Sequence, residues 1–244
     1  MRALRAQVAH ELRSTLGHGE SFLLTLGIPL GFLVFFSKVS VISYPIGDGR
    51  PVQYVAPGVM ALAVMSSAMV SLSISVGFER SYGVLTRLQA TPLGRGRLVL
   101  AKLLALLVVE AIQLAAIAAV AFALSWHPEH LLGQAALAIV LATSAFGGIA
   151  LLLAGRLDGV ANLAISNALY LVLLMSSGMV VPLAKLGGTV KAISLWLPSG
   201  ALAELLHHAF GGRVVGATPW ITLALWGTLA PLAAARLFRF EPNR

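Results

Sequence analysis

The chain has 244 residues, of which 58% are hydrophobic and only 11% are charged, with a formal net charge of +8. Soluble domains carry roughly 45–50% apolar and about 25% charged residues, so the composition excludes an ordinary soluble protein and indicates a membrane protein. The lack of cysteine excludes disulfides, thiolate metal sites and a cysteine nucleophile, and basic residues scattered between apolar runs predict no nucleic-acid partner.

Residues 1–20 predict an amphipathic helix at the membrane interface. Leucine and valine recur every four residues on one face, at Leu4, Val8, Leu12 and Leu16, and the arginines lie mostly elsewhere around the helix. Such a helix can lie along the membrane surface with its basic side toward anionic headgroups. A frayed tail before the first membrane span is the alternative.

Six apolar stretches follow, each close to the roughly 20 residues that a helix needs to cross the hydrocarbon core. They cover residues 21–41, 54–78, 98–124, 131–154, 160–181 and 217–235. The sequence therefore predicts an all-α integral membrane protein with six transmembrane helices, forming a single transmembrane domain over residues 1–244.

The distribution of Lys and Arg predicts the orientation. If the N-terminus is cytoplasmic, twelve of the 17 basic residues fall on the cytoplasmic side of these spans. By the positive-inside rule, both termini are expected in the cytoplasm. Residues 79–97 then form the main cytoplasmic loop.

Residues 182–216 form the longest outer connection. Within it, TVKAISLWLPSGALAELLHHAFGG mixes apolar with charged residues and is broken once at Pro198. This pattern predicts a short re-entrant helical hairpin between spans 5 and 6. Irregular backbone at membrane depth must be buried in protein or face water.

Polar residues within the spans are candidate lining residues of a translocation path. Glu110 is the most costly, since a charge at mid-membrane must face the bundle, a partner or water, and Gln113 shares its helix face. Asn162 and Asn167 are the candidates in the fifth span. For all four, hydrogen bonding that locks helices together is an alternative that the sequence leaves open.

The second span carries a repeat of small residues spaced by four, at Ala63, Ser67, Ser71 and Ser75. Small residues at this spacing let helices approach closely, so the repeat favours helix packing over a polar conduit.

Enzymatic and metal-binding alternatives have little support. His127 and His130 flank a proline in a short outer loop, and Ser177 and Ser199 lack the Gly-x-Ser-Gly setting of an intramembrane protease. The chain has no Gly-x-x-x-x-Gly-Lys-Ser/Thr motif for binding nucleotide phosphates. We therefore expect a non-enzymatic chain with no cofactor and no metal site of its own.

The stretch FERSYGVLTRLQATPLGRGRLVLAK, residues 78–102, resembles the cytoplasmic segment after the second span of ABC-2 type exporter permeases. The resemblance rests on Glu79, Arg80, Gly83, Leu85, Leu88, Thr91, Pro92 and Leu93, followed by Arg95, Arg97 and Lys102. SSGMVVPL (176–183) and LWLPSGALAELLH (195–207) are similar to the family's segments after the fifth and before the sixth span. This family often has an arginine where the chain has His207 and His208.

The resemblance implies the permease subunit of an ATP-driven exporter in a bacterial plasma membrane. Two permeases, identical or paralogous, would pair, each docked on a separate ABC ATPase subunit that binds ATP and Mg. The small outer loops favour a hydrophobic drug, as in multidrug efflux, or a lipid-like substrate. The alternative is a secondary transporter or channel that works without an ATPase and uses Glu110.

The expected ATPase-coupling residues lie in the cytoplasmic loop. They are Glu79, Arg80, Gly83, Val84, Leu85, Arg87, Leu88, Thr91 and Pro92. The apolar members fall on one side of a short helix, a pattern typical of a helix that docks in a partner's groove. Pro92 is expected to end this helix near Ala90 or Thr91. A solvated basic loop without a partner is the alternative.

Overall fold

A computed structural model describes residues 2–17, 19–39, 50–89, 94–129, 132–185, 187–212 and 214–238. Within these ranges all regular elements are helical, which confirms the predicted all-α class. In chain order they are α1 (Arg2–Gly17), α2 (Gly19–Lys38), α3 (Val52–Met65), η1 (Ser66–Ser71), α4 (Leu72–Ser81), α5 (Val84–Gln89), α6 (Gly94–Ala123), α7 (Leu132–Ala154), α8 (Gly159–Met175), η2 (Leu183–Lys185), α9 (Gly188–Ser194), α10 (Pro198–Phe210) and α11 (Ala217–Leu237).

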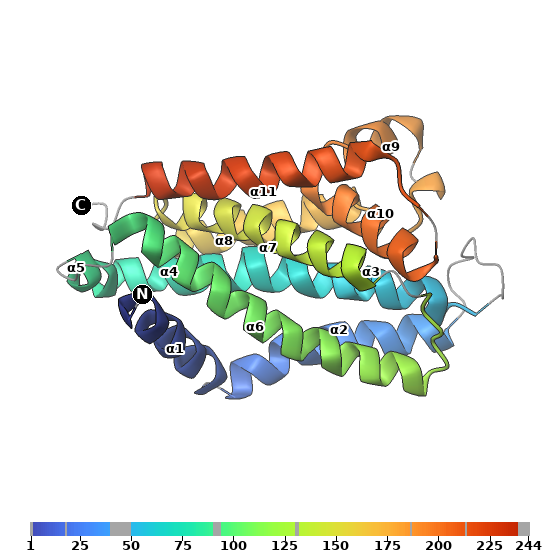
Figure 1. Ribbon diagram of the computed structural model, residues 1–244, viewed down its shortest axis with the longest axis horizontal. Helices are drawn as coiled ribbons and strands as arrows, with labels where there is room; N and C mark the ends of the chain where they lie inside the picture. The colour runs from blue at the N-terminus through green and yellow to red at the C-terminus, as the bar shows by residue number, and fades with distance from the viewer. Residues whose placement is uncertain are drawn as a thin grey trace.

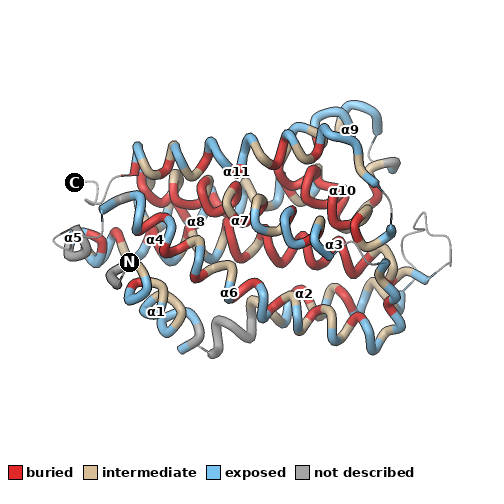
Figure 2. Tube along the Cα trace, in the orientation of Figure 1, coloured by how far each residue is buried: buried red, intermediate tan, exposed pale blue. Residues whose placement is uncertain are grey.

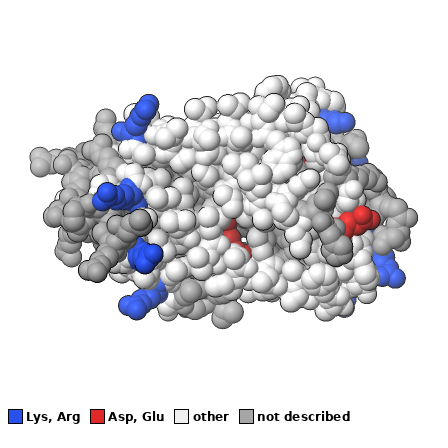
Figure 3. Space-filling model, viewed as in Figure 1, with Lys and Arg blue, Asp and Glu red and all other residues white. Residues whose placement is uncertain are grey.

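The long helices form an elongated bundle with two distinct ends (Figure 1). The start of α1, the end of α11 and the short helix α5 lie at one end, whereas α9 and α10 lie toward the other. Buried positions run through the centre of the bundle (Figure 2). On the face shown in Figure 3, Lys and Arg side chains gather toward the two ends and leave the middle largely uncharged. This distribution suits a protein whose middle lies in lipid.

Among the described residues, four helices are long and apolar enough to cross a membrane: Val52–Ser81, Gly96–Ala123, Leu132–Ala154 and Ala217–Leu237. The first is continuous through α3, η1 and α4. Two further apolar helices are shorter over their described residues, Thr25–Lys38 within α2 and Gly159–Met175. Each predicted stretch therefore contains a helix, while six full spans stay a prediction.

The fifth predicted stretch ends earlier than its hydrophobicity suggests. Helix α8 stops at Met175, whereas the apolar run continues to Val181. The Ser177 hydroxyl donates to the Leu174 carbonyl at 2.8 Å and accepts from the Met179 backbone N–H at 3.1 Å. Gly178 then adopts a φ of +76°, which turns the chain away from the helix. The boundary at residue 181 is therefore wrong.

The outer connection contains the two short helices that its pattern predicts, α9 and α10, with Pro198 as the first residue of α10. Proline is favoured there because its missing N–H would have no helical partner. The two helices meet closely, since a Cβ on Gly200 would lie 2.1 Å from the Ser194 hydroxyl oxygen. The His207 ring stacks on Tyr54 of α3 with centroids 4.0 Å apart, which ties α10 to the bundle. Entry of this hairpin into the membrane stays a prediction.

The serine repeat in the second span does not form one packing stripe. Ala63 and Ser67 are buried, whereas Ser71 and Ser75 are exposed. Residues Ser66–Ser71 form a π-helical turn, which is wider than an α-helical turn and shifts the residues that follow around the helix. Ala63 and Ser67 therefore pack as the sequence predicts, whereas Ser71, at the end of this turn, and Ser75, beyond it, do not.

Helices α7 and α11 make the most extensive helix contact among the described elements. Gly148 allows their close approach, because a Cβ at this position would lie 2.4 Å from the Pro231 nitrogen and 2.6 Å from the Ala230 carbonyl carbon. Small residues at such crossings let membrane helices pack backbone to backbone.

We predict that Gly148→Ala lowers the free energy of unfolding by about 1–3 kcal/mol, because the added methyl group forces α7 and α11 apart. Thermal unfolding in detergent micelles, followed by size-exclusion chromatography, measures the loss. Gly133→Ala is the matched control, since a Cβ at Gly133 of the same helix meets no atom within 4 Å. Equal unfolding midpoints for the two variants would contradict the prediction.

Candidate functional site

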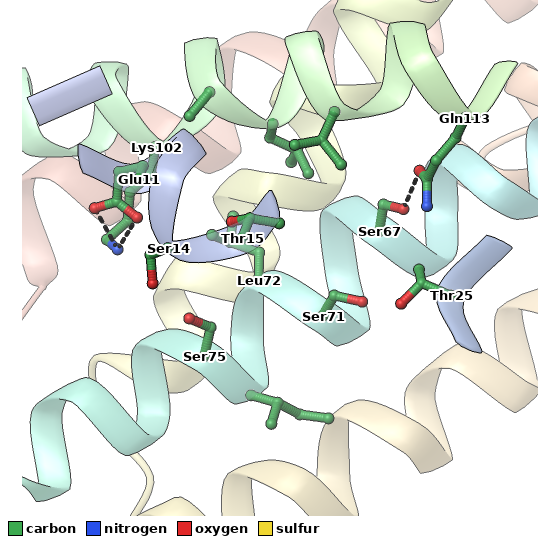
Figure 4. Close-up of a pocket in the computed structure, with 14 residues that line it drawn as sticks. Glu11, Ser14, Thr15, Thr25, Ser67, Ser71, Leu72, Ser75, Lys102 and Gln113 are labelled. Atoms are coloured by element: carbon green, nitrogen blue, oxygen red, sulfur yellow. Dashed lines mark hydrogen bonds and ion pairs between the residues drawn. The ribbon is translucent and has the colours of Figure 1, made fainter. Parts of the chain in front are cut away.

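A cavity of about 430 Å³ lies between α1, α2, the η1–α4 segment and α6 (Figure 4). This volume falls within the range of small-molecule sites. The cavity is lined by Glu11, Ser14, Thr15, Thr25, Ser67, Ser71, Leu72, Ile74, Ser75, Lys102, Ala105, Leu106, Val109 and Gln113. Hydroxyl groups come from α1, α2, η1 and α4, while α6 contributes aliphatic side chains between Lys102 and Gln113.

One end of the cavity carries an ion triad. The Lys102 ammonium lies 2.8 Å from a Glu11 carboxylate oxygen and 2.9 Å from a Glu79 oxygen. The lysine side chain is only 1% exposed, so its charge must be paired inside the protein. Because the three residues belong to α1, α4 and α6, the triad fastens these helices together.

Gln113 marks the other end of the cavity. Its side-chain carbonyl oxygen accepts a hydrogen bond from the Ser67 hydroxyl at 2.7 Å, and both side chains are buried. Lys102 and Gln113 are eleven residues apart, so they differ by only about 20° around an ideal helix and face the same cavity.

Glu110 faces a different neighbour. It is rotated by about 80° from Lys102 around α6, and the Thr143 hydroxyl of α7 donates a hydrogen bond to its carboxyl group. Glu110 is 1% exposed and is absent from the cavity lining. Glu110 and Gln113 were expected to share a face of the helix. In the structure, Glu110 lies in the α6–α7 contact and Gln113 lines the cavity.

The two candidate asparagines of α8 also lie away from this cavity. The Asn162 amide donates to the Ser73 carbonyl of α4 at 2.7 Å, and the Ser73 hydroxyl donates to the Asn162 side-chain oxygen at 2.9 Å. A Cβ on Gly77 would lie 2.6 Å from the Asn162 nitrogen, so the two helices meet tightly here. Asn167 is exposed and donates to the Leu163 carbonyl of its own helix.

Residues 79–97, the predicted coupling segment, contain the short helix that the sequence predicts, α5, but its apolar residues point in different directions. Gly83, with a φ of +71°, precedes α5. Leu85 is fully buried and packs in a cluster with residues of α4, α6, α7 and α11, whereas Val84 is 40% exposed. The expected apolar docking edge is therefore wrong for Leu85, whose side chain the chain's own core covers.

The adjacent Glu79 and Arg80 make separate internal bonds. Glu79 belongs to the ion triad, while the Arg80 guanidinium is buried and donates to the Leu157 carbonyl in the α7–α8 turn at 2.9 Å. The side chains of Arg87 and Leu88, and Thr91 and Pro92 entirely, lie outside the described residues.

Sequence reasoning missed Glu11 and did not pair Lys102 with any carboxylate. A lysine followed by a long apolar run is itself a signal, because an ammonium inside a span needs an acidic partner. The sequence does not reveal which carboxylates supply it. Across the described parts of the chain, no group of three or more His, Asp or Glu side chains could hold a metal ion.

We predict that Lys102→Met lowers the free energy of unfolding by about 3 kcal/mol, because it leaves two carboxylates unpaired. Removing one partner of a buried ion pair usually costs about 3–5 kcal/mol. We expect the lower end of that range because the side chains of Glu11 and Glu79 are still partly exposed to solvent. Lys191→Met, at an exposed position of α9, is the matched control. Adding Glu11→Gln and Glu79→Gln to Lys102→Met should restore most of the loss; a triple variant no more stable than Lys102→Met would contradict this account.

Comparison with known proteins agrees with this architecture. Residues 2–210 match the family described as ABC-2 type transporter. The chain is also 26% identical over 207 residues to a Bacillus subtilis protein named "Putative transport permease YvfS", covering 82% of each chain. The match includes the helices that surround the cavity and the cytoplasmic segment with α5. The chain therefore belongs to the ABC-2 type transporter family, and its function is that of a transport permease.

Proposed function

We propose that the chain is the permease subunit of an ATP-driven exporter, and that a separate ABC ATPase subunit docks where α5 lies. The observation that carries this proposal is the connection of α5 to the cavity wall through Glu79. Residues 79–97, the expected coupling segment, lead directly from α4 into α6. A second permease, identical or paralogous, completes the transporter, and the partner ATPase binds ATP and Mg.

Helix α5 is suited to receive force from a partner. Leu85 anchors it in the protein's own core, so the helix is held firmly against α4, α6, α7 and α11. Val84, on the neighbouring position, is exposed and available for contact. Because Leu85 is anchored in the core and Val84 is exposed, a partner that displaces α5 would also displace the helices packed around Leu85.

Two adjacent residues at the end of α4, just before α5, make bonds toward different helices. Glu79 connects the end of α4 to α1 and α6 through Lys102. Arg80 connects the same end of α4 to the α7–α8 turn. Movement of α5 would therefore shift helices that line the cavity together with helices on the opposite side of α4.

The cavity supports a hydrophobic drug or lipid-like molecule as the substrate. Its long wall on α6 is aliphatic, through Ala105, Leu106 and Val109, while hydroxyl groups face it from the other helices. Such a site offers apolar surface to most of a ligand and a few polar groups to orient it. Export across a bacterial plasma membrane, with both termini in the cytoplasm, completes the proposal.

We predict that Val84→Glu prevents binding of the ATPase subunit, because it places a charge in the proposed contact. Co-expression with candidate ABC ATPases, followed by affinity purification of the permease, measures the complex, and we expect at least a tenfold loss. Val214→Glu is the matched control, since Val214 is 84% exposed and lies in the α10–α11 connection, toward the other end of the bundle. Equal recovery of the ATPase with both variants would refute docking at α5.

One observation favours a second candidate, a proton-driven transporter that uses Glu110. The Thr143 hydroxyl carries one proton but contacts two oxygens, those of Glu110 and the Ile139 carbonyl. The other Glu110 oxygen is buried with no hydrogen-bond partner among the described residues. A carboxyl group in this setting can hold a proton within the bundle.

Glu110→Gln separates the two candidates, because glutamine keeps the shape and a hydrogen bond to Thr143 but cannot exchange a proton. For the ATP-driven exporter we predict that transport in liposomes containing the ATPase changes less than about twofold, since the isosteric glutamine keeps the packing and the hydrogen bond to Thr143. For the proton-driven transporter, uptake driven by a pH gradient without any ATPase would occur in the wild type and vanish in this variant.

A further inference from the structure

The ion triad leaves the polar end of the cavity with a formal net charge of −1, because two carboxylates surround one ammonium. The Lys102 nitrogen lies between 2.8 and 3.0 Å from both oxygens of Glu11 and both oxygens of Glu79. An ammonium has three donors, so this lysine has none left for a ligand. An anionic headgroup would therefore find no free donor at Lys102, whereas a cation would meet negatively charged acceptors.

The Glu11 carboxylate is the acceptor that faces the cavity. Gln7 donates to one of its oxygens at 2.8 Å in addition to the two contacts from Lys102. An ionised carboxylate has about four acceptor positions, so one more donor can be accommodated. Glu11 lines the cavity next to the hydroxyl-bearing residues Ser14 and Thr15.

The opposite end of the cavity presents an unused donor. Gln113 is 1% exposed, and its amide oxygen is engaged by Ser67. Its amide nitrogen makes no hydrogen bond among the described residues, and Gln113 is one of the residues that line the cavity (Figure 4). Because Gln113 lines the cavity, a ligand with an acceptor here can receive a hydrogen bond from this NH₂ group.

The two ends are separated by a distance that suits one elongated molecule. Eleven residues of α6 separate Lys102 from Gln113, which corresponds to about 16 Å along the helix axis. Between them the wall is aliphatic, through Leu72 of α4 and Leu106 and Val109 of α6.

We propose that this cavity binds an amphipathic cation. Its ammonium group is held by Glu11, its apolar body lies along Leu106 and Val109, and an acceptor at its far end receives a hydrogen bond from Gln113. That this molecule is the exported substrate rests on the proposed function, whereas its binding to the cavity does not.

Methyl 12-aminododecanoate is a suitable probe, because it has a primary ammonium at one end and an ester carbonyl at the other. We would measure equilibrium binding of the radiolabelled compound to the full chain in lipid nanodiscs, without ATPase or ATP, and subtract binding to empty discs. We expect saturable binding. Monomethyl dodecanedioate, the anionic analogue of the same length, should compete at least tenfold more weakly, and dodecylammonium, which lacks the acceptor, should bind more weakly than the probe.

Variants locate the binding in the cavity. Glu11→Gln should weaken binding at least tenfold, while Glu129→Gln, the same change at an exposed outer position, should leave it unchanged. Gln113→Leu should abolish the advantage of the probe over dodecylammonium. Ser71→Phe should block binding by filling the cavity, and it decides the question if Glu11→Gln fails to fold.

Unchanged binding in Glu11→Gln or in Ser71→Phe, or equal competition by the anionic analogue, would overturn the proposal. The proposed function is tested separately. Probe binding by a chain that never couples to an ATPase would refute only the exporter, whereas ATP-driven transport by a chain that does not bind the probe would refute only this cation site.

Discussion

The pairing of Lys102 is the constraint on which the end of the bundle around α1, α4 and α6 depends. An ammonium that is almost completely withdrawn from solvent requires acidic partners, and the chain supplies Glu11 and Glu79 from helices distant in sequence. Meeting this requirement places α1 against α6 and α4, and α1 makes extensive contact with α6. The same arrangement closes one end of the cavity and consumes every donor of the lysine. Fold, cavity and charge thus follow from one pairing.

Hydrophobic periodicity predicted the helices but not what each helix faces. It placed Glu110 and Gln113 on one side of the third span, and both side chains are buried. It could not divide that side, because the 60° or so between Glu110 and Gln113 matters only when the positions of α7 and η1 are known. Leu85 shows the same limit: an apolar residue on a short helix can face a partner or its own core, and the sequence pattern is identical.

Local backbone geometry accounts for most remaining differences. Average hydrophobicity continues past Met175, but the side-chain hydrogen bonds of Ser177 and the positive φ of Gly178 end the helix. The π-helical turn at Ser66–Ser71 interrupts a regular serine repeat, so that Ser67 is buried whereas Ser71 and Ser75 are exposed. Neither the early end of α8 nor the π-helical turn alters the hydrophobicity or the spacing of residues in the sequence. A prediction from hydrophobic spacing therefore cannot detect them. Glycine and serine near the end of an apolar run are the visible indications.

The neighbouring residues Glu79 and Arg80 divide the end of α4 between two sets of contacts. Successive residues of a helix point about 100° apart, so one reaches α1 and α6 on the cavity side and the other reaches the α7–α8 turn. Just beyond that turn, Asn162 bonds Ser73 and fixes α8 to α4. Because these connections are charged or buried hydrogen bonds, they are stiff compared with apolar contacts, which can slide. Under the proposed function, a displacement of α5 would move both sides of α4 together, as a transporter requires if one docking helix is to reshape its cavity.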